Sequence, residues 1–89
     1  MFNWDDLKHF LAVARHGSTT AAGRAMKVDQ STVQRRLAEL EHRIGQPLVE
    51  RRATGYRLTT YGHELLPHAE RVEQQMLALQ RFVQSSHGS

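Results

Sequence analysis

The sequence predicts a mainly α-helical chain: three helices and a two-stranded hairpin within residues 1–59, a long helix over residues 60–85 and a disordered tail over residues 86–89. Three observations support this prediction. Apolar residues recur at helical spacing between residues 30 and 44, two strand-like runs flank a glycine-containing turn near residue 54, and a heptad pattern runs from residue 65 to residue 83. A chain of 89 residues has room for one small core.

The first predicted helix begins after Asn3, which can cap it, and Asp6 stands where it can complete a capping box. Gly17 can adopt a left-handed conformation and end this helix, and Ser18 can cap the next one. The apolar residues that should face inward from the first helix are Trp4, Leu7, Phe10, Leu11 and Ala14. We expect this helix to be part of the core.

A pair of helices joined by a tight turn is predicted next. Residues 20–26 form a short alanine-rich helix, Lys27 and Val28 are too few for anything except a sharp turn, and the side chain of Asp29 is expected to cap the helix that follows. Small residues would let the two helices cross closely: Ala21, Ala22 and Ala25. The second helix carries one apolar stripe: Val33, Leu37, Leu40 and Ile44. This pattern is typical of a helix-turn-helix, whose second helix enters the major groove of DNA.

The exposed front of this second helix has the side chains that read bases. Arginine pairs with guanine O6 and N7, and carboxamides pair with adenine N6 and N7, so Arg35 is the first candidate for a base contact and Gln30 the second. Arg36 lies nearer the buried stripe, where a phosphate or an acidic partner suits it better. The candidate DNA-binding residues are Ser18, Thr20, Gln30, Ser31, Thr32, Gln34, Arg35, Arg36, Arg52 and Arg57.

Residues 48–51 and 56–58 are strand-like, and residues 52–55 between them contain a glycine that suits a tight turn. This hairpin would be the wing of a winged helix-turn-helix. Arg52 and Arg57 are expected to contact the DNA backbone or the minor groove.

Thr59 is expected to cap the last helix, in which Pro67 should cause a bend or a slight unwinding. The heptad seam of this helix comprises Leu65, Ala69, Val72, Met76, Leu79 and Val83. The far end of such a long helix would expose its apolar residues to water in a monomer, so we expect a homodimer formed through this helix.

Basic residues are concentrated around the second helix of the predicted helix-turn-helix, residues 30–44, which we call the reading helix. Residues 24–57 contain eight basic and four acidic side chains, whereas the remainder contains four basic and five acidic ones. This distribution favours a polyanionic partner.

Most of the chain resembles the DNA-binding region of the LysR-type bacterial transcriptional regulators. The similar segment matches in order and without gaps, and it reads AVARHGSTTAAGRAMKVDQSTVQRRLAELEHRIGQPLVERRATGYRLTTYG. The matching positions include Gly17, Ser18, Ala22, Gln30, Val33, Arg35, Leu40, Glu41, Gly45, Pro47, Leu48, Arg51, Leu58, Thr59 and Gly62. The resemblance implies sequence-specific binding of double-stranded DNA by a cytoplasmic homodimer at an interrupted palindrome. It also implies an effector-binding domain after the long last helix. A small-molecule effector is therefore expected only for that domain, outside this sequence.

Four positions depart from the usual pattern of that family. Asp29 and Gln34 stand where serine is common, and Thr19 and Val49 stand where an aromatic residue is frequent. These differences concern the reading helix and the packing around it, so they bear on which DNA sequence is preferred.

Other classes of function find little support in the sequence. Six histidines show no pair at metal-binding spacing, there is no cysteine, and no nucleophile motif or phosphate-binding loop occurs, so we expect no metal, no cofactor and no enzymatic activity. No apolar run is long enough for a membrane span. The alternative is a winged-helix protein-interaction module with a coiled-coil stem. RNA binding is weaker, because the six aromatic residues fall mostly at core-like positions.

Overall fold

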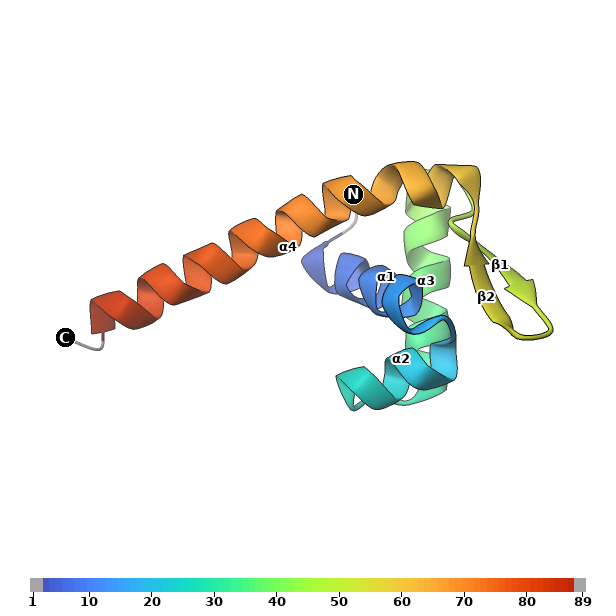
Figure 1. Ribbon diagram of the computed structural model, residues 1–89, viewed down its shortest axis with the longest axis horizontal. Helices are drawn as coiled ribbons and strands as arrows, with labels where there is room; N and C mark the ends of the chain where they lie inside the picture. Colours follow the sequence, from blue (N-terminus) through green and yellow to red (C-terminus); the bar gives the residue numbers. More distant parts are fainter. Residues whose placement is uncertain (1–2, 88–89) are drawn as a thin grey trace.

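The computed structural model describes residues 3–87, which form four helices and one two-stranded sheet in a body with a protruding stem (Figure 1). The elements are α1 (Trp4–His16), α2 (Thr19–Met26), α3 (Gln30–Ile44), β1 (Val49–Arg52), β2 (Gly55–Leu58) and α4 (Thr60–His87). The long helix gives the molecule extents of 50 × 25 × 19 Å. The predicted fold class, a winged helix-turn-helix followed by a long helix, is confirmed.

Local signals in the sequence fix both ends of α1. The capping box of Asn3 and Asp6 is present, with each side chain accepting a hydrogen bond from the other residue's backbone N–H. Gly17 ends the helix in the left-handed region at φ 80°, and its N–H donates to the carbonyl of Val13. The predictions for the two ends of α1 are therefore both confirmed.

The turn between α2 and α3 differs in one detail from the prediction. Lys27, which is not a glycine, adopts φ 60° there, and the side chain of Asp29 makes no capping hydrogen bond although Asp29 occupies the N-cap position. The predicted side-chain cap at Asp29 is thus wrong. Gly23 is required by the same turn, since a Cβ atom there would lie 2.8 Å from the carbonyl oxygen of Val28.

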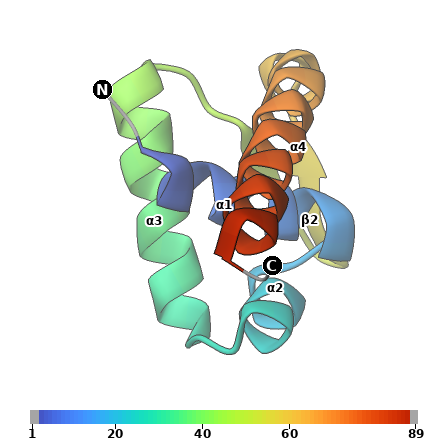
Figure 2. The same ribbon diagram turned by 90° about the vertical axis from the view of Figure 1, so that its left-hand side faces the viewer.

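The core is built where α1, α2 and α3 pack together, and Figure 2 shows α3 standing upright beside α1, with α2 beside the lower end of α3. Ala22 is fully buried at the crossing of the helix pair, whereas Ala25 is exposed. The buried apolar residues are Leu7, Phe10, Leu11, Ala12, Val13, Ala22, Val33, Leu37, Leu40, Leu48 and Ala69. Each fully buried leucine or phenylalanine contributes about 1.5–3 kcal/mol to stability.

The wing is an antiparallel pair in which Val49 lies opposite Leu58 and Arg52 opposite Gly55, so only residues 53 and 54 form its turn. The wing packs against the start of the helix pair: the N–H of Tyr56 donates to the carbonyl of Gly17 at 2.7 Å. Gly55 has φ 132°, and a Cβ atom there would collide with the same carbonyl oxygen. Gly55 therefore allows the wing to approach the turn between α1 and α2.

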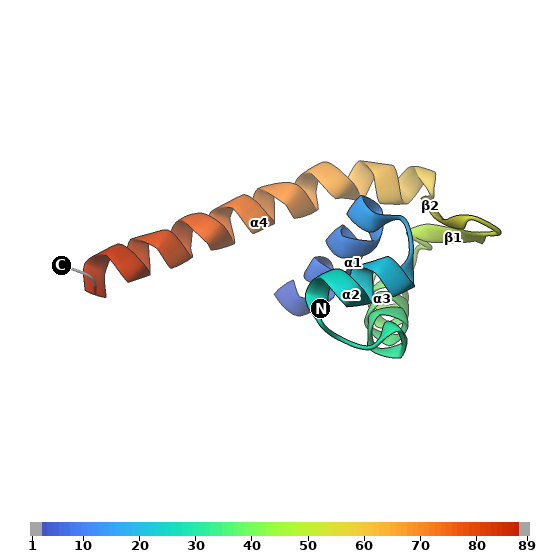
Figure 3. The ribbon, with the colours of Figure 1, turned by 60° about the horizontal axis from the view of Figure 1, so that its bottom comes forward.

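Helix α4 begins with the predicted cap, because the hydroxyl of Thr59 accepts from the N–H of Gly62 at 3.0 Å. The helix stays continuous through Pro67 and curves away from the body (Figures 1 and 3). Ser86 and His87 are helical, which corrects the predicted disordered tail over residues 86–89; Gly88 and Ser89 lie outside the described residues. Within residues 3–87, no helix is long and apolar enough to span a membrane.

The heptad seam of α4 divides into two parts. Ala69 is only 1% exposed and Leu65 packs against the same core cluster, so these two residues face their own domain rather than a partner. The heptad period alone could not tell which part of this face the domain itself covers. Further along, Val72, Leu79 and Val83 are 40–55% exposed.

Candidate nucleic-acid interface

Helix α3 has a buried side and an exposed side. Val33, Leu37 and Leu40 are buried against the body, while Ser31, Gln34 and Arg35 are exposed and Thr32 is half-buried. Arg35 makes one loose ion pair, with its Nε 3.9 Å from the carboxylate of Glu39 one turn further along the helix. Because both side chains are well exposed, this pair does little to hold the guanidinium, which stays accessible to a partner.

The carboxamides of Gln30 and Gln34 both point toward α2. Their Nε2 atoms donate to the hydroxyl oxygen of Thr19, at 3.2 Å from Gln30 and 3.5 Å from Gln34. Thr19 itself is only 1% exposed. The two glutamines that were predicted as DNA contacts are therefore brought together by one buried residue, which the sequence marked as a departure from the family pattern but did not place beside them.

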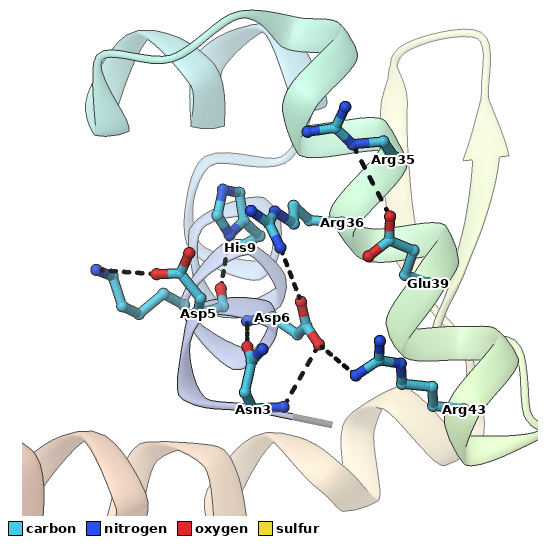
Figure 4. Close-up of polar contacts among 9 residues, drawn as sticks. Asn3, Asp5, Asp6, His9, Arg35, Arg36, Glu39 and Arg43 are labelled. Atoms are coloured by element: carbon cyan, nitrogen blue, oxygen red, sulfur yellow. Dashed lines mark hydrogen bonds and ion pairs between the residues drawn. The ribbon is translucent and has the colours of Figure 1, made fainter. Parts of the chain in front are cut away.

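The opposite edge of α3 is held by a buried carboxylate (Figure 4). Asp6 is 1% exposed, and its two oxygens each lie 3.9 Å from a guanidinium nitrogen, one of Arg36 and one of Arg43. An acidic partner was one of the two predictions for Arg36, and Asp6 is that partner. The pairing of Asp6 with two arginines was not predicted. Its role in the capping box already explains an acidic residue at this position, and the two arginines lie on a helix that is distant in the sequence.

The wing and the N-terminus of α2 are neighbours on the surface. Ser18 caps α2 through its hydroxyl, which accepts from the N–H of Ala21, and Thr20 is exposed in the first turn. Since Tyr56 is bonded to Gly17, the arginine that follows it, Arg57, lies on the strand beside this turn and is exposed. The backbone of strand β2 therefore lies next to the turn that precedes α2.

Arg52 lies near the tip of the wing and forms an exposed ion pair with Glu50 at 2.7 Å. Another carboxylate, that of Glu41, ties the wing to α3 by accepting from the N–H groups of Leu48 at 2.6 Å and Val49 at 3.3 Å. Glu41 matched the family pattern in sequence, but no local signal revealed that it anchors the wing.

A bidentate ion pair joins the body to the stem. Arg15 in α1 donates to both carboxylate oxygens of Glu73 in α4, at 2.8 and 2.6 Å. The hydrogen bond from Arg15 lowers the pKa of Glu73 below its ordinary value and the same contact raises the pKa of Arg15, so both groups are held charged. This contact links the stem to the body beyond the packing of Leu65 and Ala69, and it was not predicted.

Within residues 3–87, no group of three or more histidine or acidic side chains is placed to hold a metal ion. The site instead offers guanidinium groups, hydroxyl groups and carboxamides around a helix that is exposed along one side. Such groups bind phosphate oxygens and the edges of bases in the major groove.

Comparison with known proteins agrees with this description. Residues 4–63 match the family described as "Bacterial regulatory helix-turn-helix protein, lysR family". The transcriptional regulator GalR of Pseudomonas putida is 47% identical over 70 residues, which cover 79% of this chain and 18% of that protein. The regulator TcbR of a Pseudomonas species is 39% identical over 66 residues, covering 74% and 22%. The chain thus spans roughly a fifth of the length of these relatives.

Solved structures give the same result. A complex of the DNA-binding domain of CbnR with DNA superposes with a TM-score of 0.86 at 30% identity, covering 96% of this chain and 98% of that one. A complex of the BenM DNA-binding domain with benA site 1 DNA has a TM-score of 0.80 at 25% identity, covering 92% and 99%. From its sequence match and its fold, the chain belongs to the LysR family of bacterial regulatory proteins and is a winged helix-turn-helix DNA-binding domain with its linker helix.

Proposed function

We propose that this domain binds double-stranded DNA sequence-specifically as a homodimer, with one α3 from each protomer in the major groove of one half-site. The observation that carries the proposal is the exposed row of Ser31, Gln34 and Arg35 on a helix whose other side is anchored in the core. A helix held in this way presents its side chains to the groove at little cost in conformational freedom.

Within this row, Arg35 is the proposed base reader. Its guanidinium is only loosely paired with Glu39 at 3.9 Å, so binding to guanine O6 and N7 breaks no strong contact. Gln30, Ser31, Thr32 and Gln34 are the proposed supporting contacts to base edges or phosphates. Arg36 is a weaker candidate, because reaching a phosphate would take it away from the buried Asp6.

The backbone contacts are proposed to come from α2 and the wing. Ser18 and Thr20 lie at the N-terminus of a helix, where free N–H groups and the helix dipole favour phosphate. Arg57 lies on the strand beside that turn, and Arg52 lies at the wing tip, where it must exchange Glu50 for a phosphate. These contacts would position α3 without carrying sequence information of their own.

Dimerisation is proposed to use the distal stem. Val72, Met76, Leu79 and Val83 continue the heptad beyond the part of α4 that the core covers. A shallow, mostly apolar groove runs along this face between Val72 and Leu79. Two stems paired along it would bury apolar surface and hold two reading helices apart, so the preferred site would be an interrupted palindrome.

By family membership, the whole protein is proposed to be a cytoplasmic transcriptional regulator with a small-molecule-binding domain beyond the stem. The competing interpretation, a protein-interaction module with a coiled-coil stem, predicts no preference among DNA sequences. Selection from a random-sequence duplex library at about physiological salt separates the two. We expect an enriched interrupted palindrome; folded protein that enriches no sequence and is not retained on DNA would favour the competing interpretation.

A further inference from the structure

Thr19 places a single buried hydroxyl between the two reading-helix carboxamides. It is the first residue of α2, it is 1% exposed, and its oxygen accepts from the Nε2 atoms of Gln30 and Gln34, one helical turn apart on α3. A hydroxyl oxygen has two lone pairs, so it can serve both glutamines at once. The three side chains therefore form one small network across the crossing of α2 and α3.

This network decides how each carboxamide is oriented. The terminal torsion of a glutamine is broad, so a free side chain presents its oxygen and its nitrogen almost interchangeably. With Nε2 bonded to Thr19, Oε1 is the atom of each planar amide that has no hydrogen-bond partner among the described residues, and it is left available to a ligand. Oε1 is a hydrogen-bond acceptor, and in the major groove it matches the amino groups of adenine N6 and cytosine N4.

We propose that Thr19 is a specificity-determining residue that acts through Gln30 and Gln34, by holding their oxygens toward the DNA so that they favour adenine N6 or cytosine N4 at the contacted base and disfavour guanine O6 or thymine O4 there. This inference rests on the proposed function of α3. Thr19 would touch no base itself, because it is buried beneath the reading helix. Its contribution is the orientation of two neighbours.

Two substitutions separate the effect of the Thr19 hydroxyl from the effect of its packing. Valine has the shape of threonine without the hydroxyl, so Thr19→Val keeps the buried volume while it releases both amides, and Thr19→Ser keeps the acceptor while it removes a methyl group. The matched control is Thr54→Val at the exposed wing turn, where no carboxamide contact is present among the described residues. Circular dichroism melting establishes that each variant is folded. If Thr19→Val does not fold, Thr19→Ala provides the same loss of the hydroxyl.

The decisive experiment is library selection with each variant. We expect Thr19→Val to lose preference about two- to tenfold at the base pairs that Gln30→Ala or Gln34→Ala also affect, which is the size of one lost hydrogen bond. Thr19→Ser and Thr54→Val should keep the wild-type preference. Adding Thr19→Val to the Gln30→Ala, Gln34→Ala double variant should change nothing further, because the side chains through which it acts are gone.

Three results would overturn the proposal. Unchanged base preference in Thr19→Val would show that the hydroxyl does not orient the glutamines that contact the bases. If Thr19→Val reduced the preference equally in the Gln30→Ala, Gln34→Ala double variant, Thr19 would have to act by another route. Unchanged side-chain amide resonances of Gln30 and Gln34 in the NMR spectrum of free Thr19→Val would show that the network does not exist, and this last result is independent of DNA. Failure of the proposed function is recognised separately, since then the wild-type domain itself enriches no sequence.

Discussion

Arg15 in α1 donates hydrogen bonds to both carboxylate oxygens of Glu73 in α4, at 2.8 and 2.6 Å, and so joins the reading body to the stem. We expect Glu73→Gln to lower the free energy of unfolding by about 0.5–1 kcal/mol at pH 7, a small value because the pair is partly exposed. Glu70→Gln is the control. Its carboxylate lies 4.0 Å from Arg15 and makes no such bidentate contact, so its loss should be smaller. Urea unfolding measures both.

The same pair makes the stability pH-dependent in one direction. Because its contact with Arg15 lowers the pKa of Glu73 in the folded state, the stabilisation is fully present above the ordinary glutamate value of 4.5 and is lost as the pH falls through the lower folded pKa. The difference between wild type and Glu73→Gln should therefore be constant near neutrality and shrink in acid. A difference that grew as the pH fell would contradict this assignment.

Arg35 and Arg52 should have separable effects on DNA binding. Arg35→Ala is expected to cost about 1–3 kcal/mol on the selected site and to relax its specificity, because a base contact is lost. Arg52→Ala should weaken binding to all sequences alike and lower the salt slope by about one phosphate contact. Fluorescence anisotropy at several salt concentrations distinguishes them, and equal losses on specific and random duplexes for both variants would reject the distinction.

Lys27 adopts a left-handed conformation that glycine adopts more easily. Lys27→Gly should raise the free energy of unfolding by up to about 1 kcal/mol. Lys8→Gly, an exposed position inside α1, should instead lower it by about 1 kcal/mol, because glycine weakens a helix interior. Urea midpoints test the pair, and destabilisation by both substitutions would count against the strained turn.

The stem should be the dimer interface. Met76→Glu combined with Leu79→Glu places two charges on the apolar groove, so the variant should be a folded monomer with poor binding to the palindrome. Gln74→Glu combined with Ala78→Glu adds the same charge at exposed positions away from that groove and should remain dimeric. Sedimentation equilibrium reports the mass, and a wild-type domain that is itself monomeric at high concentration would remove the basis of this prediction.

Much of the fold could be predicted because its signals are local. The capping box of Asn3 and Asp6, the left-handed Gly17 and the cap at Thr59 each depend on residues within a few positions of one another, and all are present. The exception, the cap at Asp29, shows the limit of such signals. A suitable residue at the right position still has to adopt the right side-chain orientation, and there it does not.

The features that were missed all depend on how distant elements are packed. Asp6 holds Arg36 and Arg43 across two helices, and Thr19 holds two glutamines in the next one. The two parts of the heptad seam in α4 were missed for the same reason. The period is identical where Ala69 packs against the core of its own domain and where Leu79 is exposed to solvent. The sequence therefore could not separate the covered part of the seam from the exposed part. Helical period defines a face, but only the tertiary arrangement defines its neighbour.

The most direct test of the central claim, that α3 reads bases from the major groove, pairs one side chain with one base atom. Replacing a guanine of the selected site by 7-deazaguanine removes the N7 acceptor and leaves Watson–Crick pairing intact. Wild-type protein should then lose about tenfold or more in affinity at the guanine in each half-site, and Arg35→Ala should show no further loss there. Equal losses for wild type and Arg35→Ala, or no loss at any guanine, would contradict the claim.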